Sequence, residues 1–171
     1  MIGLGSNLYD ETNIIPITSK YRTFVDSHIA KNWAGPFVVS RRALHDTRTQ
    51  QGFVAVTSGE VVGYVLYNIA HGECEITVLE SLRPKQGIGH VLVDAIIRVA
   101  KEMELSRVWL ITTNDNTPAI RFYQRCEFTL KAVHINSMEE SRKLKPQIPL
   151  IGLNGIPLVH EIEFEIREVT T

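Results

Sequence analysis

The spacing of hydrophobic residues changes several times along the first third of the chain. Between residues 18 and 33 apolar side chains recur at helical spacing, and Gly35-Pro36 ends that pattern. Phe37–Ser40 reads as a short extended piece. Residues 1–15 look like an irregular lead-in, and residues 41–50 look like a polar loop or a short turn of helix.

A period of two then takes over. Residues 52–57 and 61–69 flank Ser58-Gly59-Glu60, which predicts a β-hairpin. His71-Gly72 allows a second turn before a third strand over residues 74–82. Short turns between consecutive strands predict an antiparallel meander.

The second half of the chain alternates helices with strands. After a loop at residues 83–89, an apolar stripe from Val91 to Met103 predicts a strong helix. The remaining expected elements are a buried strand over 108–113, a helix capped by Thr117 with Pro118 in its first turn, a strand over 128–134, a helix over 137–144 and a last strand over 160–169. Residues 145–160 are rich in proline and glycine, and a loop of this length is often functional.

This order predicts one α/β domain of the α+β kind over residues 1–171, with a mixed, mostly antiparallel sheet and helices on both faces. Hydrophobic residues make up 44% of the chain and charged residues 22%, which is ordinary for a soluble globular protein. The formal net charge of −1 argues against nucleic-acid binding, and no apolar run is long enough to span a membrane. Two cysteines, Cys74 and Cys126, fit a reducing cytoplasm.

The loop before the strong helix has the features of an anion site. Gly87 and Gly89 lack Cβ atoms, so their N–H groups can approach a phosphate where the helix dipole begins. Lys85 and His90 supply nearby positive or donor groups. The Walker pattern is absent, and Leu92 occupies the place of the third glycine of a dinucleotide fingerprint.

A second motif runs from Thr112 to Phe128 and contains Asn116-Thr-Pro-Ala-Ile-Arg-Phe-Tyr123. Together with Pro84-Lys-Gln-Gly-Ile-Gly89, it resembles the GNAT superfamily of N-acetyltransferases over about residues 50–135, with an acetyl-CoA-binding core at 74–128. The tail after residue 143 resembles one bacterial subgroup. The resemblance implies the GNAT acyl-CoA N-acyltransferase fold and acetyl-CoA as co-substrate. No metal is expected, because His71-Gly-Glu-Cys74 is only half of a metal site and no second pair exists.

The resemblance also assigns roles to individual residues. It places acetyl-CoA against Thr77, Val78 and Leu79 on a strand, against Lys85, Gln86, Gly87, Ile88, Gly89 and His90 around the pyrophosphate, and against Asn116 and Tyr123. Tyr123 would protonate the departing thiolate, and the N–H of Leu79 would stabilise the oxyanion.

The general base is left open by the sequence. One branch of the superfamily has a glutamate five residues before the asparagine, where this chain has Ile111. Glu73 and Glu75 are the candidates, because simple alternation puts both on the same side of the strand as Thr77 and Leu79. A water chain is the remaining alternative.

The expected function is acetyl transfer to a primary amine by direct attack in a ternary complex; the alternative is a non-catalytic acyl-CoA-binding or regulatory module. The acceptor, a small molecule or a peptide amine, is not readable, although the 145–160 loop is expected on its side. Glu161, Glu163 and Glu165 could attract a cationic amine, but a solvated strand face explains them equally well. A homodimer is possible, because the superfamily often dimerises.

Overall fold

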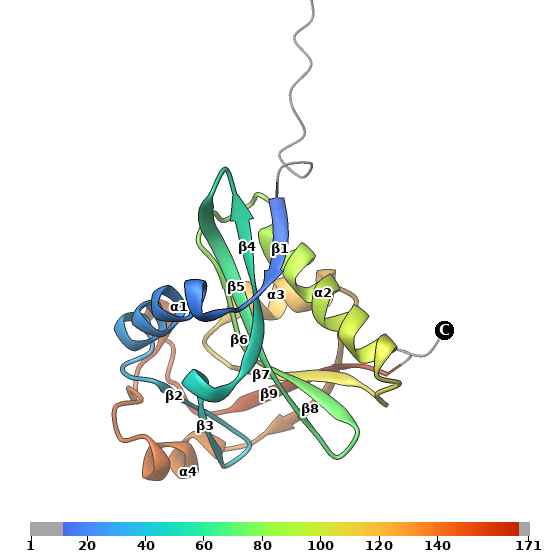
Figure 1. Ribbon diagram of the computed structural model, residues 1–171. Helices are drawn as coiled ribbons and strands as arrows, with labels where there is room; N and C mark the ends of the chain where they lie inside the picture. Colours follow the sequence, from blue (N-terminus) through green and yellow to red (C-terminus); the bar gives the residue numbers. More distant parts are fainter. Residues whose placement is uncertain (1–11, 168–171) are drawn as a thin grey trace, which may run out of the picture.

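The computed structural model describes residues 12–167, which form one mixed sheet, a small hairpin and several helices (Figure 1). The seven-stranded sheet has the order β1-β4-β5-β6-β7-β9-β8. Its strands are β1 (Thr12–Pro16), β4 (Gln51–Thr57), β5 (Glu60–Ala70), β6 (Glu73–Ser81), β7 (Val108–Thr113), β9 (Glu161–Ile166) and β8 (Thr129–His134). Only β6 and β7 are parallel neighbours, so the expected mostly antiparallel sheet is confirmed.

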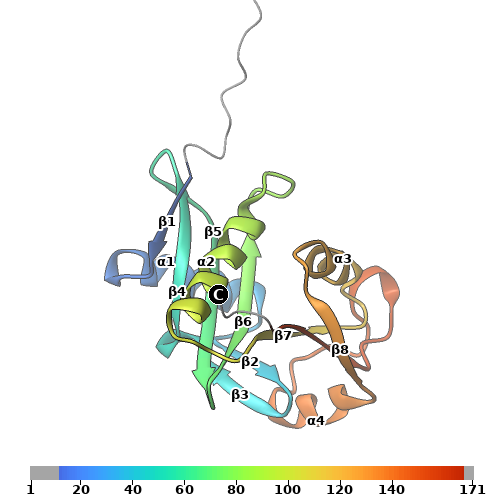
Figure 2. The ribbon, with the colours of Figure 1, turned by 90° about the vertical axis from the view of Figure 1, so that its right-hand side faces the viewer.

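Helices cover both faces of the sheet, as expected (Figures 1 and 2). They are α1 (Ser19–Asn32), α2 (Ile88–Glu102), α3 (Thr117–Arg125) and α4 (Ser137–Leu144), with short 3₁₀ turns at Thr47–Thr49 and Leu153–Gly155. The N-cap of α3 is Asn116, whose side chain accepts a hydrogen bond from the Ala119 N–H at 3.2 Å. The expectation that Thr117 caps this helix is therefore wrong, and Thr117 is its first residue.

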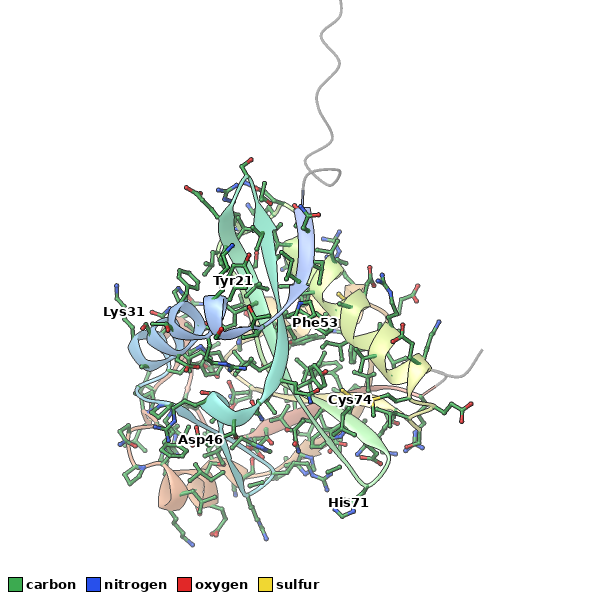
Figure 3. The ribbon with its side chains drawn as sticks, viewed as in Figure 1. Tyr21, Lys31, Asp46, Phe53, His71 and Cys74 are labelled. Atoms are coloured by element: carbon green, nitrogen blue, oxygen red, sulfur yellow. The ribbon has the colours of Figure 1, made fainter. Side chains whose placement is uncertain are left out.

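Alternation along the strands divides the core into two layers. On one face, α2 and α3 pack Leu92, Ile96 and Tyr123 against the sheet. On the other, α1 packs Val25 and Ile29. Phe53 and Tyr21 lie on these opposite sides in Figure 3.

Two segments expected to be irregular are strands. Residues 12–16 form the edge strand β1, while residues 1–11 and 168–169 of the predicted elements lie outside the described part. Residues 41–50 contain β3 (Ala43–Asp46), which pairs with β2 (Phe37–Ser40). Arg41 and Arg42 make this two-residue turn at φ values of 45° and 65°. Two-residue turns with positive φ values usually contain asparagine or glycine. Because this turn contains two arginines instead, the sequence did not indicate a hairpin here.

The central strands β6 and β7 separate soon after they begin to pair. Their ladder joins Cys74, Glu75 and Ile76 to Val108, Trp109 and Leu110, and no further pair follows. The remainder of β6 therefore has no strand beside it on the β7 side. A gap opens in the middle of the sheet, and its edges carry backbone groups that the ladder does not use.

A bulge in β6 changes which side chains face which side. Leu66 of β5 opposes Val78, whereas the next residue, Tyr67, opposes Ile76, so Thr77 is the extra residue. The Thr77 hydroxyl donates to Gln50 Oε1 at 2.7 Å. Glu75 and Leu79 consequently lie on opposite faces, so the simple alternation used to relate them is wrong.

Candidate functional site

Two cavities meet at the gap between β6 and β7. The first, here called the acidic cavity, has a volume of about 430 Å³ and includes Glu75, Glu80 and Glu161 in its wall. The second, here called the basic cavity, has a volume of about 690 Å³ and lies between the start of α2 and the outer side of α3. Leu79, Ala119 and Tyr123 belong to the walls of both.

The basic cavity is suited to an anion. Lys85, His90, Arg121 and Arg125 lie in its wall, and no described aspartate or glutamate does. Several positive groups around one opening attract negative charge and are complementary to phosphate.

The backbone at the start of α2 adds hydrogen-bond donors to the basic cavity. Gly87 caps the helix at φ 76°, a left-handed conformation that glycine adopts without strain. The His90 and Val91 N–H groups donate to the Gly87 carbonyl, but those of Gly87, Ile88 and Gly89 reach no acceptor within residues 12–167. Free N–H groups at the positive end of a helix dipole form an anion site.

Gly89 has a packing role that the sequence does not reveal. A Cβ atom at this position would lie 2.9 Å from Cζ of Phe122, which is too close for an ordinary contact. The Phe122 ring in turn packs edge-on against His90, with 5.1 Å between ring centroids. The second glycine of the loop therefore lets α3 approach α2 and brings Tyr123 toward the gap.

Tyr123 lies where the two cavities join. Its ring packs against Phe122, Phe128 and Phe164, with centroid distances of 5.2–6.4 Å. The hydroxyl has no hydrogen-bond partner among the described residues, and burial raises the pKa of Tyr123 well above its usual value. The phenol therefore stays protonated at neutral pH and can donate a proton within the gap.

Glu75 lines the acidic cavity and is 5% exposed. Its Oε1 accepts a hydrogen bond from the Ser40 hydroxyl, and the His45 imidazole lies 3.6 Å from its Oε2. Burial raises the pKa of Glu75 to about 7, although the Ser40 hydrogen bond and the Arg41 charge oppose that shift. A carboxyl with this pKa exchanges a proton readily at neutral pH.

Ser40 and His45 come from the β2–β3 hairpin, which was not expected from the sequence. The Ser40 oxygen lies 2.9 Å from His45 Nε2, so the two residues and Glu75 form one hydrogen-bonded chain. Burial lowers the pKa of His45, which favours its neutral form. In the sequence, the only sign of these partners of Glu75 was a serine and a histidine five residues apart. That spacing cannot be interpreted until the hairpin is known to bring the two side chains together.

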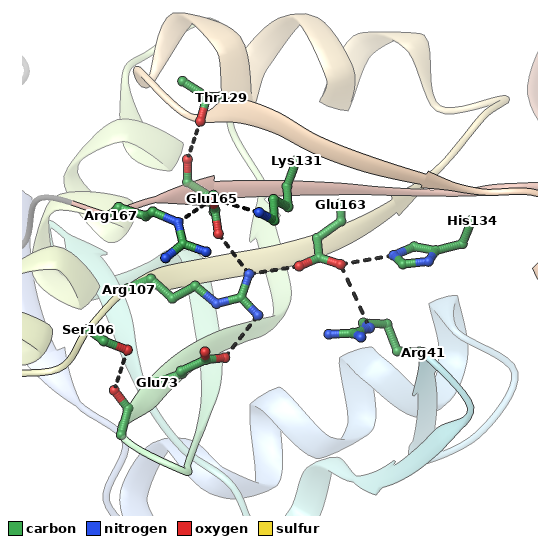
Figure 4. Close-up of polar contacts among 11 residues, drawn as sticks. Arg41, Glu73, Ser106, Arg107, Thr129, Lys131, His134, Glu163, Glu165 and Arg167 are labelled. Carbon is green, nitrogen blue, oxygen red and sulfur yellow. Dashed lines mark hydrogen bonds and ion pairs between the residues drawn. The ribbon is translucent and has the colours of Figure 1, made fainter.

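Glu73, the other candidate base, occupies a different environment. Its carboxylate pairs with Arg107 at 2.9 Å and does not line either cavity. Arg107 also pairs with Glu163 at 2.7 Å and with Glu165 at 2.8 Å, as Figure 4 shows. Glu73 is thus part of an ion-pair network. Its carboxylate is already paired with Arg107 and is not placed to accept a proton from a substrate in either cavity.

The 145–160 loop is fastened to the turn between β7 and α3. The side-chain Oδ1 of Asn114 accepts hydrogen bonds from the N–H groups of Val159 and His160, both at 2.9 Å. Asp115 accepts one from the Leu153 N–H at 2.8 Å. The polar residues that precede Asn116 therefore hold one wall of the acidic cavity in place.

Comparison with known proteins agrees with this geometry. The model of the acetyltransferase (GNAT) family matches residues 19–128. The chain belongs to the GNAT acetyltransferase family. It is 38% identical over 152 residues, or 88% of this chain and 95% of the other, to the uncharacterised protein YdhI of Bacillus subtilis (strain 168).

Solved GNAT structures share the fold. One is a GNAT family acetyltransferase from Elizabethkingia anophelis with acetyl-CoA bound; its TM-score is 0.67 at 18% identity, covering 92% of this chain and 99% of that one. Another is a Bacillus subtilis acetyltransferase in complex with CoA, with a TM-score of 0.64 at 16% identity, covering 92% and 97%. The expected GNAT fold is therefore confirmed.

Most of the residues expected to contact acetyl-CoA line one or both of the two cavities. Lys85, Gly87, Ile88, Gly89 and His90 line the basic cavity, Thr77, Val78 and Asn116 line the acidic cavity, Leu79 and Tyr123 line both, and Gln86 lines neither. Within residues 12–167, none of the helices has the length and hydrophobicity needed to cross a membrane.

Proposed function

We propose that this protein is an N-acetyltransferase that moves the acetyl group of acetyl-CoA to a primary amine by direct attack. The observation that carries this proposal is the gap between β6 and β7, where a buried glutamate and a protonated tyrosine flank adjoining cavities of opposite charge. GNAT relatives with acetyl-CoA or CoA bound support the choice of co-substrate.

In this proposal the basic cavity holds the phosphates of acetyl-CoA. Lys85 and Arg121 supply charge, and the free N–H groups of Gly87, Ile88 and Gly89 supply donors. The pantetheine arm then enters the gap beside β6, where the backbone from Thr77 onward has no partner on the β7 side. The Leu79 N–H is the proposed donor to the thioester oxygen.

The acceptor approaches from the acidic cavity, on the opposite face of the sheet. Glu75 takes the proton that the attacking nitrogen loses, and Ser40 and His45 position its carboxyl group. A carbon–nitrogen bond forms at the thioester carbonyl as the carbon–sulfur bond breaks. Tyr123 gives its hydroxyl proton to the departing sulfur, so one proton leaves the amine and one reaches the thiol.

Thiol release from acetyl-CoA in the presence of an amine panel tests this function. We expect Tyr123→Phe to lower turnover about 10- to 1000-fold, the usual reach of a general acid, with little change in acetyl-CoA affinity. Unchanged turnover would exclude the proposed role of Tyr123.

A calorimetric titration with acetyl-CoA separates the two functions expected from the sequence. Tight binding without acetyl transfer to any amine would favour a non-catalytic acyl-CoA-binding module. Transfer that requires both substrates, with the acetylated amine identified by mass spectrometry, would support the enzyme.

A further inference from the structure

Three glutamates on one face of β9 are buried to a similar degree. Glu161, Glu163 and Glu165 are 2%, 3% and 5% exposed, so the solvated face considered from the sequence is wrong. The face is covered in part by α4, whose Ser141 contacts Glu161, and by the β2–β3 hairpin, whose Arg41 contacts Glu163. A buried carboxylate is costly unless a cation or several hydrogen bonds compensate its lost hydration.

Glu163 and Glu165 have such compensation. Both pair with Arg107, and Figure 4 shows the cations that complete their environment. Glu163 also contacts His134 at 2.9 Å, and Glu165 contacts Arg167 at 2.6 Å. Burial opposes their ionisation, but these hydrogen bonds outweigh it and lower the pKa of both carboxyl groups.

Glu161 is different. Its carboxylate receives a single hydrogen bond, from the Ser141 hydroxyl to Oε1 at 3.2 Å. Its Oε2 accepts none from the described residues, and no lysine, arginine or histidine among them lies within 4 Å. Glu161 is also the one member of the three that lines the acidic cavity.

The buried lysine in the same wall does not neutralise Glu161. The Lys145 ammonium group donates to the carbonyl oxygens of Trp33 and Phe37, the latter at 2.7 Å. Those contacts tie the start of the 145–160 loop to the end of α1 and to β2. Lys145 thus has a structural role, and the carboxylate of Glu161 is left facing the cavity without a cation.

We infer that Glu161 binds a second cationic group of the acceptor, so that the acceptor is a small diamine-type dication carrying a primary amine. This inference rests on the proposed function, because it places the reacting amine at Glu75. The two carboxyl groups line one cavity, and the charge of Glu161 contributes to the raised pKa of Glu75, so they are within electrostatic reach. Val38, Ile148 and Leu158 provide an apolar wall for a methylene chain in that cavity.

Matched pairs of amines test the inference. Putrescine and n-butylamine share a four-carbon chain and differ in the second ammonium group, as do cadaverine and n-pentylamine. We expect the wild-type protein to have a KM at least about tenfold lower for each diamine than for its monoamine. Glu161→Gln keeps the shape and the acceptor of the Ser141 hydrogen bond, so it should raise the diamine KM about tenfold and the monoamine KM much less, which removes the preference for the diamine.

Glu140→Gln, which removes a partly exposed charge that α4 pairs with Lys143 outside both cavities, is the matched control and should change neither KM. Equal KM values for diamines and monoamines in the wild type, or diamine KM values unaffected by Glu161→Gln, would overturn the inference. Acetylation of monoamines alone would overturn it while leaving the proposed function intact. Calorimetric titration of the CoA-bound protein with putrescine gives a second readout. If putrescine does not bind, the inference is overturned, even if no amine is acetylated. If no amine of the panel is acetylated, the result counts against the proposed function instead.

Discussion

Glu75 shows how one residue can connect stability with activity. Its pKa rises from an ordinary value near 4.5 to about 7 in the folded protein, mainly because the carboxyl group is buried. At a pH below about 4.5 the carboxyl group is protonated in both the folded and the unfolded state, so its ionisation does not change the free energy of unfolding. As the pH rises toward 7 the unfolded chain ionises first, so the folded state loses relative stability.

This linkage predicts that Glu75→Gln is stabilising in neutral and alkaline solution. We expect the free energy of unfolding to increase by about 1–3 kcal/mol at about pH 8 and to change little at about pH 4. Urea denaturation at both pH values measures the difference. Glu140→Gln should show no such pH-dependent gain, and a gain for Glu75→Gln that is as large at low pH as at high pH would refute the linkage.

The sequence was informative for some site residues and not for others. Gly87 and Tyr123 belong to contiguous motifs, so their positions at the gap follow from local pattern. The choice between Glu73 and Glu75 depends on partners far away in the chain, Arg107 in one case and Ser40 in the other. The bulge at Thr77 also changes the alternation on which that choice was based, and no residue type announces it.

At the scale of elements, the 145–160 loop is ordered by its contacts with the β7–α3 turn. Asn114 also donates from Nδ2 to the Pro157 carbonyl at 2.9 Å, so its side chain holds three backbone groups of this segment. The sequence predicted a loop on the acceptor side of the site. It did not show that the neighbouring motif fastens it, because the partners are more than 40 residues apart.

Asn114→Ala should loosen this wall of the acidic cavity. Two partly buried backbone N–H groups lose their acceptor, so we expect faster hydrogen exchange at Val159 and His160. The looser wall should also raise the KM for the amine acceptor, while the acetyl-CoA affinity stays the same. Exchange measured by mass spectrometry and steady-state kinetics check both effects. Asn13→Ala, at an exposed position of β1, is the control, and equal exchange in the two variants would contradict the proposed fastening.

At the scale of the whole molecule, charge is distributed in a way that the net value of −1 conceals. Positive groups surround the basic cavity, whereas carboxylates line the acidic cavity on the other side of the gap. A third group of charges, centred on Arg107, joins β6, β7 and β9 through Glu73, Glu163 and Glu165. The overall composition argued against nucleic-acid partners but could not reveal this separation.

Arg107 is predicted to be the most important of these charges for stability. Arg107→Met leaves Glu163 and Glu165 buried without their shared cation, and we expect a loss of about 3–5 kcal/mol in the free energy of unfolding. Arg48→Met, which breaks an exposed ion pair with Asp46, should lower the free energy of unfolding far less, because solvent screens that pair. Similar urea midpoints for the two variants would show that the buried network contributes little.

The proposed mechanism places acetyl transfer in the gap between β6 and β7, with Glu75 as the base. The pH dependence of kcat/KM for a diamine, compared between the wild type and Glu75→Gln, tests it most directly. We expect the wild-type rate to fall as the pH drops through about 7, because protonated Glu75 cannot accept the amine proton, and we expect that limb to be absent from a much slower Glu75→Gln variant. An unchanged rate and an unchanged pH profile in Glu75→Gln would show that Glu75 is not the base.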